Sequence, residues 1–189
     1  MQIRAGSGTS GTGGAGEDDG EDGFTLFVAT RWSALVRTAY LLTGDFHEAE
    51  DLVQSTLAKV YPHWRRMRRE TADAYLRAAL VNNNRSRYRR RRVAQLLTPY
   101  VPDRPSSTPG PGEGTGVDGD LLAAALAALP ERQRAVVVLR YWEDLSVEEV
   151  AGMLGCSVGT VRSQASRALA KLRAHPALSE EALHGLEAR

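Results

Sequence analysis

The segment Leu145–Arg173, LSVEEVAGMLGCSVGTVRSQASRALAKLR, decides the fold of the C-terminal part of the chain. Ser146 and Glu149 have the spacing of a capping box, so a short helix is expected to begin there. Gly155 supplies a tight turn, and Ser157 is a suitable N-cap for a second, longer helix. Two helices joined by a short turn that contains glycine are typical of a helix-turn-helix.

The second helix of this pair has the charge expected of a DNA-binding helix. Between Val158 and Arg173 there are four lysine or arginine residues and no acidic residue. Such a helix suits the major groove, because its N-terminal part faces base edges and its later cations meet phosphates. The alternative is an ordinary amphipathic helix with a solvated basic face. The turn spacing, the cap and the sign of the charge together favour DNA.

The chain as a whole is predicted to be all-α, with two small helical domains joined by a flexible linker. The linker covers residues 93–119, because this stretch contains five prolines and five glycines. It is long enough to span roughly 80 Å when extended. The C-terminal domain covers residues 120–174, with one helix expected over 121–129 and a second beginning at Pro130. Residues 1–23, glycine-rich and acidic, are predicted to be a disordered arm, and residues 175–189 a tail.

The N-terminal domain, residues 24–92, is also predicted to be helical. Apolar residues recur at steps of three and four from Phe24 to Leu42, which indicates one face of a helix. Asp45 is placed to cap a second helix, which Pro62 is expected to kink or end. Thr71 is expected to cap a third helix.

Charge is strongly segregated along the chain although the formal net charge is only +1. Residues 24–93 contain fourteen lysines and arginines against six acidic residues. Two basic clusters, 65–69 and 85–92, flank the third helix, which favours a phosphate-binding surface over a solvated charge run. Tyr75 is predicted to be a core aromatic, whereas Tyr88 is equally consistent with a core position and with stacking on an unpaired base.

These segments resemble a known family. DFHEAEDLVQSTLAKVY (45–61), AYLRAALVNNNRSRYRRRR (74–92) and the region from Leu129 to Arg173 are similar, in this order, to the extracytoplasmic-function group of bacterial sigma-70 factors, in the actinobacterial style. The resemblance covers about two thirds of the chain. It implies that residues 24–92 are sigma region 2, which docks on core RNA polymerase and recognises and melts the −10 element. It also implies that residues 120–174 are sigma region 4, which recognises the −35 element.

The resemblance also implies roles for individual residues. The residues that match polymerase-docking positions are Asp51, Gln54 and Ser55. The residues implied in −10 binding are Arg68, Arg69, Asn82, Asn83, Arg85, Arg87, Tyr88, Arg89 and Arg90. The residues implied in −35 binding are Ser157, Thr160, Arg162, Ser163, Gln164, Arg167 and Lys171. Ser55 departs from the family pattern, which usually has an acidic residue at this position.

The expected partners are core RNA polymerase, through its β′ clamp and β flap, promoter DNA and an anti-sigma factor. The main alternative is an autonomous helix-turn-helix regulator that binds operator DNA, which would not need the EAEDLVQ segment (48–54). No cofactor, metal site or enzymatic activity is expected, because the four histidines are scattered and no nucleophile has an evident base. The single cysteine, Cys156, and the lack of a long apolar run predict a cytoplasmic protein without a membrane span.

Overall fold

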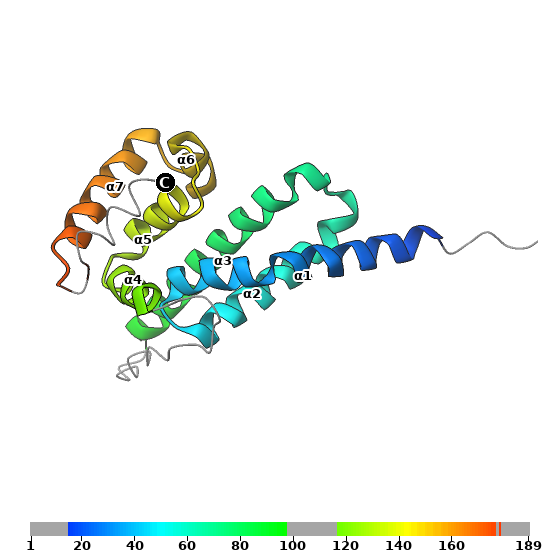
Figure 1. Cartoon of the computed structure of the whole chain (residues 1–189), viewed down its shortest axis with the longest axis horizontal. Coiled ribbons are helices and arrows are strands. Elements are labelled where there is room, and N and C mark those ends of the chain that lie inside the picture. Colours follow the sequence, from blue (N-terminus) through cyan, green and yellow to red (C-terminus); the bar gives the residue numbers. More distant parts are fainter. Residues whose placement is uncertain (1–14, 98–116, 177, 179–189) are drawn as a thin grey trace, which may run out of the picture.

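The computed structural model describes residues 15–97, 117–176 and 178. Within these ranges every regular element is helical (Figure 1). The N-terminal module contains α1 (Ala15–Thr43), α2 (Phe46–Val60), η1 (Tyr61–Arg66) and α3 (Arg69–Leu97). The C-terminal module contains α4 (Val117–Ala127), α5 (Glu131–Val137), η2 (Val138–Trp142), α6 (Val147–Leu154) and α7 (Val158–Arg173).

The helices extend into regions expected to be irregular. Helix α1 begins at Ala15, within the predicted disordered arm. Helix α3 continues to Leu97, and α4 begins at Val117, so both ends of the predicted linker are helical. Residues 1–14 of the predicted arm, 98–116 of the predicted linker, and 177 and 179–189 of the predicted tail lie outside the described residues.

The predicted caps are confirmed at three helix starts. Asp45 Oδ1 accepts a hydrogen bond from the Glu48 amide at 2.9 Å. In α6 the Ser146 amide donates to Glu149 Oε2 at 2.7 Å, and the Glu149 amide donates to Ser146 Oγ at 3.2 Å, which completes a capping box. Ser157 Oγ accepts a hydrogen bond from the Thr160 amide at 3.2 Å and so caps α7.

Two predictions from the sequence concern the connection between α2 and α3, one at Pro62 and one at Thr71. The prediction for Pro62 is confirmed: α2 ends at Val60, two residues before Pro62, and the chain continues as the 3₁₀ helix η1. The prediction that Thr71 caps the third helix is wrong. Helix α3 already begins at Arg69, and the Thr71 hydroxyl instead donates to the Arg68 carbonyl at 3.0 Å.

Each module has an apolar interior. In the N-terminal module α1, α2 and α3 bury Leu52, Leu76 and Leu80 almost completely. In the C-terminal module the buried side chains include Leu139 and Leu172. The chain changes from α5 into a π-helical turn, η2, whose last bond joins the Glu143 amide to the Val138 carbonyl at 3.0 Å.

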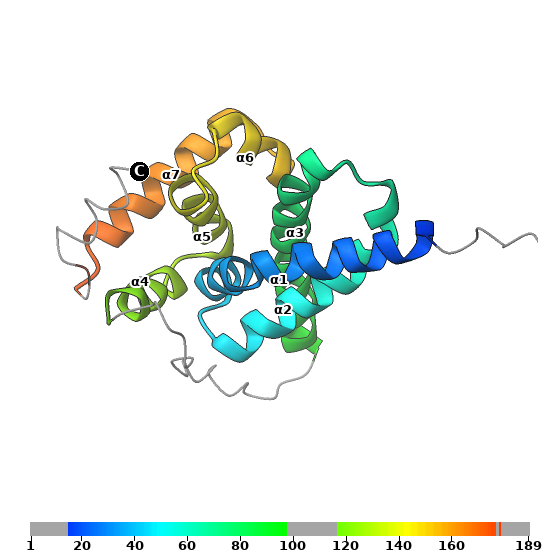
Figure 2. The same ribbon diagram turned by 45° about the vertical axis from the view of Figure 1, so that its right-hand side comes forward.

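The two modules pack against each other. Helix α1 contacts α4, α5 and η2, and α3 contacts α5 and α6 (Figures 1 and 2). Their buried apolar residues form one continuous cluster. The Tyr40 hydroxyl donates across the boundary to Asp120 Oδ1 at 3.1 Å. The two domains predicted from the sequence therefore share an apolar interface in this structure.

No helix among the described residues is both long and apolar enough to cross a membrane.

Candidate nucleic-acid and partner interface

The outer face of α2 presents polar side chains to solvent. Asp51 and Gln54 are exposed and lie one turn apart, as predicted for a contact with another helix. Ser55 differs from them because it is only partly exposed. Its hydroxyl donates to the Leu52 carbonyl at 3.1 Å and accepts from Asn83 Nδ2 at 2.9 Å, so it faces α3.

The three consecutive asparagines of α3 lie in different environments. Asn82 is exposed, Asn84 is half-buried, and Asn83 is only 5 % exposed. Asn83 Nδ2 donates to the hydroxyls of Ser55 and Thr56, each at 2.9 Å, and its Oδ1 accepts from the Lys59 ammonium. The structure therefore uses Asn83 to join α3 to α2, which makes it unsuitable for the direct DNA contact assigned to it.

Replacing Asn83 with alanine is expected to destabilise the chain by about 1–3 kcal/mol. The substitution leaves the buried hydroxyl of Thr56 without its donor and removes the acceptor of Lys59. The free energy of unfolding in urea measures this effect. Asn82→Ala is the matched control and should change stability by less than about 0.5 kcal/mol, because Asn82 is exposed. Equal effects of the two substitutions would contradict the structural role of Asn83.

In the arginine-rich segment 85–92, some side chains contact other residues of the chain and others face solvent. Arg91 Nη1 lies 2.7 Å from both carboxylate oxygens of Glu48, and Arg87 Nη2 lies 3.9 Å from Asp51 Oδ2. Both acidic partners are on α2, so these arginines also help to hold α2 against α3. The side chains of this segment that are exposed and have no such contact with α2 are Arg89, Arg90 and Arg92.

The turn between η1 and α3 presents a second basic surface. Arg68 and Arg69 are exposed, and the Arg69 guanidinium carbon lies 3.9 Å above the ring of Trp64. Trp64 itself is only 2 % exposed and packs against Phe24 and Phe27, with ring centroids 5.2 and 4.9 Å away. Our sequence analysis did not identify Trp64, although an aromatic residue directly before a basic cluster is a signal for such a stack.

The tyrosines of α3 are both accessible. Tyr75 is 44 % exposed, so the prediction that it belongs to the core is wrong. It lies one helix position before Leu76, which points inward and is 2 % exposed. Tyr88, whose environment the sequence left open, is 50 % exposed.

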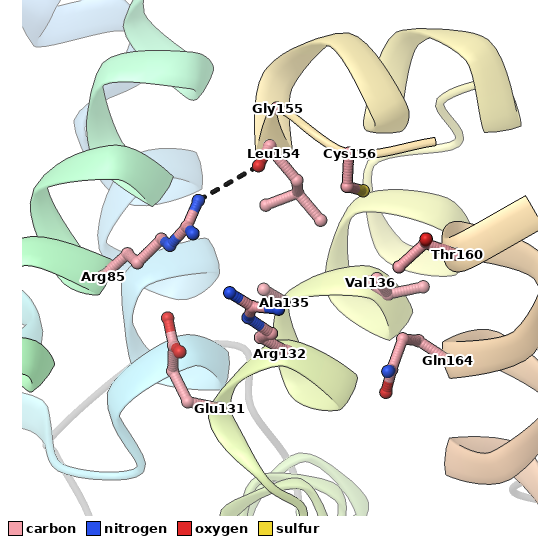
Figure 3. A pocket seen from close by; sticks show the side chains of 10 residues that line it. All are labelled: Arg85, Glu131, Arg132, Ala135, Val136, Leu154, Gly155, Cys156, Thr160 and Gln164. Carbon is pink, nitrogen blue, oxygen red and sulfur yellow. Dashed lines mark hydrogen bonds between the residues drawn. The ribbon is translucent and has the colours of Figure 1, made fainter. Parts of the chain in front are cut away.

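The residues predicted to bind the −35 element differ in their exposure to solvent. Four are exposed on the outer side of α7: Arg162, Ser163, Arg167 and Lys171. Thr160 and Gln164 are half-buried and line a cavity of about 80 Å³ together with Arg85 of the N-terminal module (Figure 3). Ser157 has a structural contact as well, since its hydroxyl caps α7 and lies 2.9 Å from the Thr160 hydroxyl.

The cavity lies between the two modules. Arg85 extends from α3 and donates through Nη1 to the Leu154 carbonyl at 3.0 Å, at the C-terminal end of α6 (Figure 3). Cys156 lines the same cavity and is half-buried. Among the described residues there is no group of three or more histidine, cysteine, aspartate or glutamate side chains that could hold a metal ion.

Comparison with known families and proteins gives matches over both modules. The sigma-70 region 2 model matches residues 28–93, and the sigma-70 region 4 model matches residues 119–172. The RNA polymerase sigma-E factor of Streptomyces coelicolor is 40 % identical over 151 residues, which cover 79 % of this chain and 84 % of that protein. The ECF RNA polymerase sigma factor SigL of Mycobacterium tuberculosis is 33 % identical over 147 residues, covering 75 % of this chain and 81 % of that protein.

A solved structure has a similar fold. It is the sigma factor RpoE in complex with the anti-sigma factor NepR from Bartonella quintana, which superposes with a TM-score of 0.69 and 28 % identity. The superposition covers 81 % of this chain and 96 % of that one.

Proposed function

We propose residue roles from one premise: this chain belongs to the extracytoplasmic-function group of the sigma-70 family of RNA polymerase sigma factors. The chain binds core RNA polymerase and directs transcription initiation at promoters that it recognises through their −35 and −10 elements. The observation that supports this function best is the match of sigma-70 regions 2 and 4, in that order, on a single chain. An operator-binding regulator would need a helix-turn-helix but not region 2, so this alternative is not favoured.

The N-terminal module is proposed to bind both polymerase and the −10 element. Asp51 and Gln54 on α2 form the proposed contact with the β′ clamp, and Ser55 supports α2 from the inner side through its bond to Asn83. The proposed −10 contacts are Asn82, Tyr88 and the exposed arginines Arg68, Arg69, Arg89 and Arg90. Tyr88 has the exposure that stacking on an unpaired base requires.

The C-terminal module is proposed to bind the −35 element through α7. Arg162 and Ser163 lie in the N-terminal half of this helix, where side chains reach base edges, while Arg167 and Lys171 lie further along, near phosphates. The proposed partners also include an anti-sigma factor, as in the complex of the Bartonella relative. We also propose that the chain, as an initiation factor, has no enzymatic activity of its own and acts in the cytoplasm together with RNA polymerase.

Gel filtration with bacterial core RNA polymerase near physiological salt tests this function. The wild-type chain is expected to co-elute with the core enzyme. A double variant, Asp51→Ala with Gln54→Ala, is expected to bind about tenfold or more weakly, because side chains central to an interface often contribute more than about 1 kcal/mol each. Asp22→Ala, which removes an exposed carboxylate from the N-terminal half of α1, is the control and should bind as the wild type does. Failure of the wild type to co-elute would favour the operator-binding regulator.

A further inference from the structure

We propose that a pocket between α3 and α5 binds a small nucleotide that carries linked phosphates, such as a nucleoside diphosphate. The pocket has a volume of about 410 Å³, which lies within the range of about 300–1,000 Å³ typical of small-molecule sites. We call it the arginine pocket, because it is lined by Arg87, Arg91, Arg92 and Arg134. The inference goes beyond the proposed function and does not depend on it.

One side of α3 supplies half of the arginine pocket. The lining residues of this helix are all polar or aromatic and recur at steps of three and four: Asn84, Arg87, Tyr88, Arg91 and Arg92. Such spacing places side chains on one face of a helix, where an apolar stripe is usual. Here the face is polar and lies opposite Arg134 of α5. Arg89 and Arg90, which are proposed to contact DNA, do not line the pocket.

Two of the four guanidinium groups are held in place by other contacts. Arg134 donates through Nη1 to the Leu42 carbonyl at 2.8 Å and through Nη2 to the Ala127 carbonyl at 2.7 Å. Arg91 Nη1 lies 2.7 Å from both carboxylate oxygens of Glu48. Side chains that are already ordered lose little conformational freedom when a ligand binds, so these contacts lower the cost of binding.

Other polar groups of the pocket have hydrogen-bonding capacity that the described residues do not use. Within those residues, Arg92 and Asn84 form no side-chain hydrogen bond or ion pair, and Arg134 Nε is buried without an acceptor. A guanidinium offers five N–H donors, and phosphate accepts them in pairs. The pocket therefore has unused donors of the kind that bind phosphate best.

The charge of the pocket also favours an anion. Glu48 and Glu131 are its acidic residues, against four arginines, so the lining is positive. A hollow lined mainly by one sign of charge concentrates the electric field and attracts ions of the opposite sign. Two linked phosphates balance the excess of arginines better than a single phosphate does. A bound diphosphate would also relieve the repulsion among the guanidinium groups.

Tyr88 gives the pocket an accessible aromatic ring. It is 50 % exposed and lines the pocket between Arg87 and Arg91 on the same face of α3. A base stacks on an aromatic side chain with little dependence on its sequence identity. The neighbouring amide of Asn84 can both donate and accept a hydrogen bond. We therefore assign the phosphates of the ligand to the arginines and its base to Tyr88.

Isothermal titration calorimetry of the full-length chain tests this site, with adenosine diphosphate (ADP) and inorganic pyrophosphate as the two probes. The titrations are made near physiological salt and without magnesium, so that the arginines alone meet the phosphates. ADP is expected to bind at one site per chain. Pyrophosphate should bind at the same site about tenfold more weakly, because it has no base to stack. Absence of saturable ADP binding would overturn the inference.

Arg92→Gln is the most informative variant, because Arg92 is exposed and its loss should not disturb the fold. It is expected to weaken binding of both probes by about tenfold to one hundredfold. Arg132→Gln is the matched control, since Arg132 is exposed on α5 but lines the separate cavity shown in Figure 3. Glu131→Gln, which removes an acidic residue of the pocket, should bind both probes more tightly. Equal weakening by Arg92→Gln and Arg132→Gln would indicate diffuse attraction and overturn the site.

Tyr88→Ala tests the position of the base. It is expected to weaken ADP binding by about tenfold and to leave pyrophosphate binding unchanged. The same affinity of Tyr88→Ala and the parent chain for ADP would overturn the assignment of a nucleotide. Circular dichroism checks that every variant is folded. Co-elution with core RNA polymerase is measured separately, so failure of the nucleotide site and failure of the proposed function give different results.

Discussion

Trp64→Ala is expected to destabilise the N-terminal module by about 3–5 kcal/mol, the largest effect we predict for a single substitution. Trp64 is 2 % exposed and lies beneath the guanidinium of Arg69, with Phe24 and Phe27 against its ring. Its removal leaves a large cavity between α1, η1 and the start of α3. Because small domains are stable by only about 5–15 kcal/mol, much of the module's stability would be lost.

Urea unfolding monitored by circular dichroism measures this change, and Trp64→Phe is its matched control. Among the described residues, Trp64 Nε1 is buried without a hydrogen-bond partner, so phenylalanine keeps an apolar ring and removes an unpaired donor. We expect Trp64→Phe to cost much less than Trp64→Ala. A loss below about 1 kcal/mol for the alanine variant would show that the aromatic cluster does not support the module.

Arg162→Ala is expected to reduce recognition of the −35 element by about tenfold to one hundredfold. Arg162 is exposed in the N-terminal half of α7, where a recognition helix contacts base edges, and a good arginine–base contact contributes about 1–3 kcal/mol. Discrimination against altered −35 sequences should decrease together with affinity. Binding of the polymerase complex to a promoter selected with the wild-type chain, and to the same promoter with base changes in the −35 element, measures both quantities.

Lys171→Ala is the matched comparison, since it also removes one cation from the exposed side of α7. Lys171 lies in the last turn of the helix, where contact with phosphate is expected. This variant should weaken binding to all sequences alike and reduce the salt dependence of log K by about one unit. If both variants lose affinity without any change in sequence preference, then Arg162 does not contact bases.

Local features of the fold were predictable from the sequence because they depend on residues close together in the chain. Asp45, Ser146 and Ser157 cap helices as expected, and Gly155 adopts a left-handed conformation with φ of 61° in the predicted turn. Thr71 was mispredicted because a competing start, at Arg69, lies only two residues earlier. Tyr75 was mispredicted because an error of one position on a helix rotates a side chain by about 100°, from the core to solvent.

The environments of the candidate site residues depended on contacts that the sequence does not reveal. Asn82 and Asn83 are identical neighbours, yet only Asn83 meets the hydroxyls of α2. Arg87 and Arg91 looked like members of a uniform basic run until the facing acidic residues of α2 were known. The packing of one module on the other was also missed, because the hydrogen bonds across the boundary join residues far apart in the chain. Glu143 bonds Thr38, Arg134 bonds Leu42 and Arg85 bonds Leu154, over separations of 105, 92 and 69 residues.

Because η2 is a π-helical turn, the number of residues in this segment determines the direction of the side chains that follow it, as much as the identity of those residues does. A π turn contains about one residue more than an α-helical turn, and each residue of an α-helix advances the chain by about 100°. Loss of a single residue from 138–142 would restore ordinary helical pitch and rotate Glu143 away from Thr38 and Arg77, although all three side chains would still be present. Two related chains could therefore have the same interface residues and differ only in the direction in which the Glu143 side chain points from the helix axis. An alignment of such chains would show an intact Glu143 contact where geometry has abolished it.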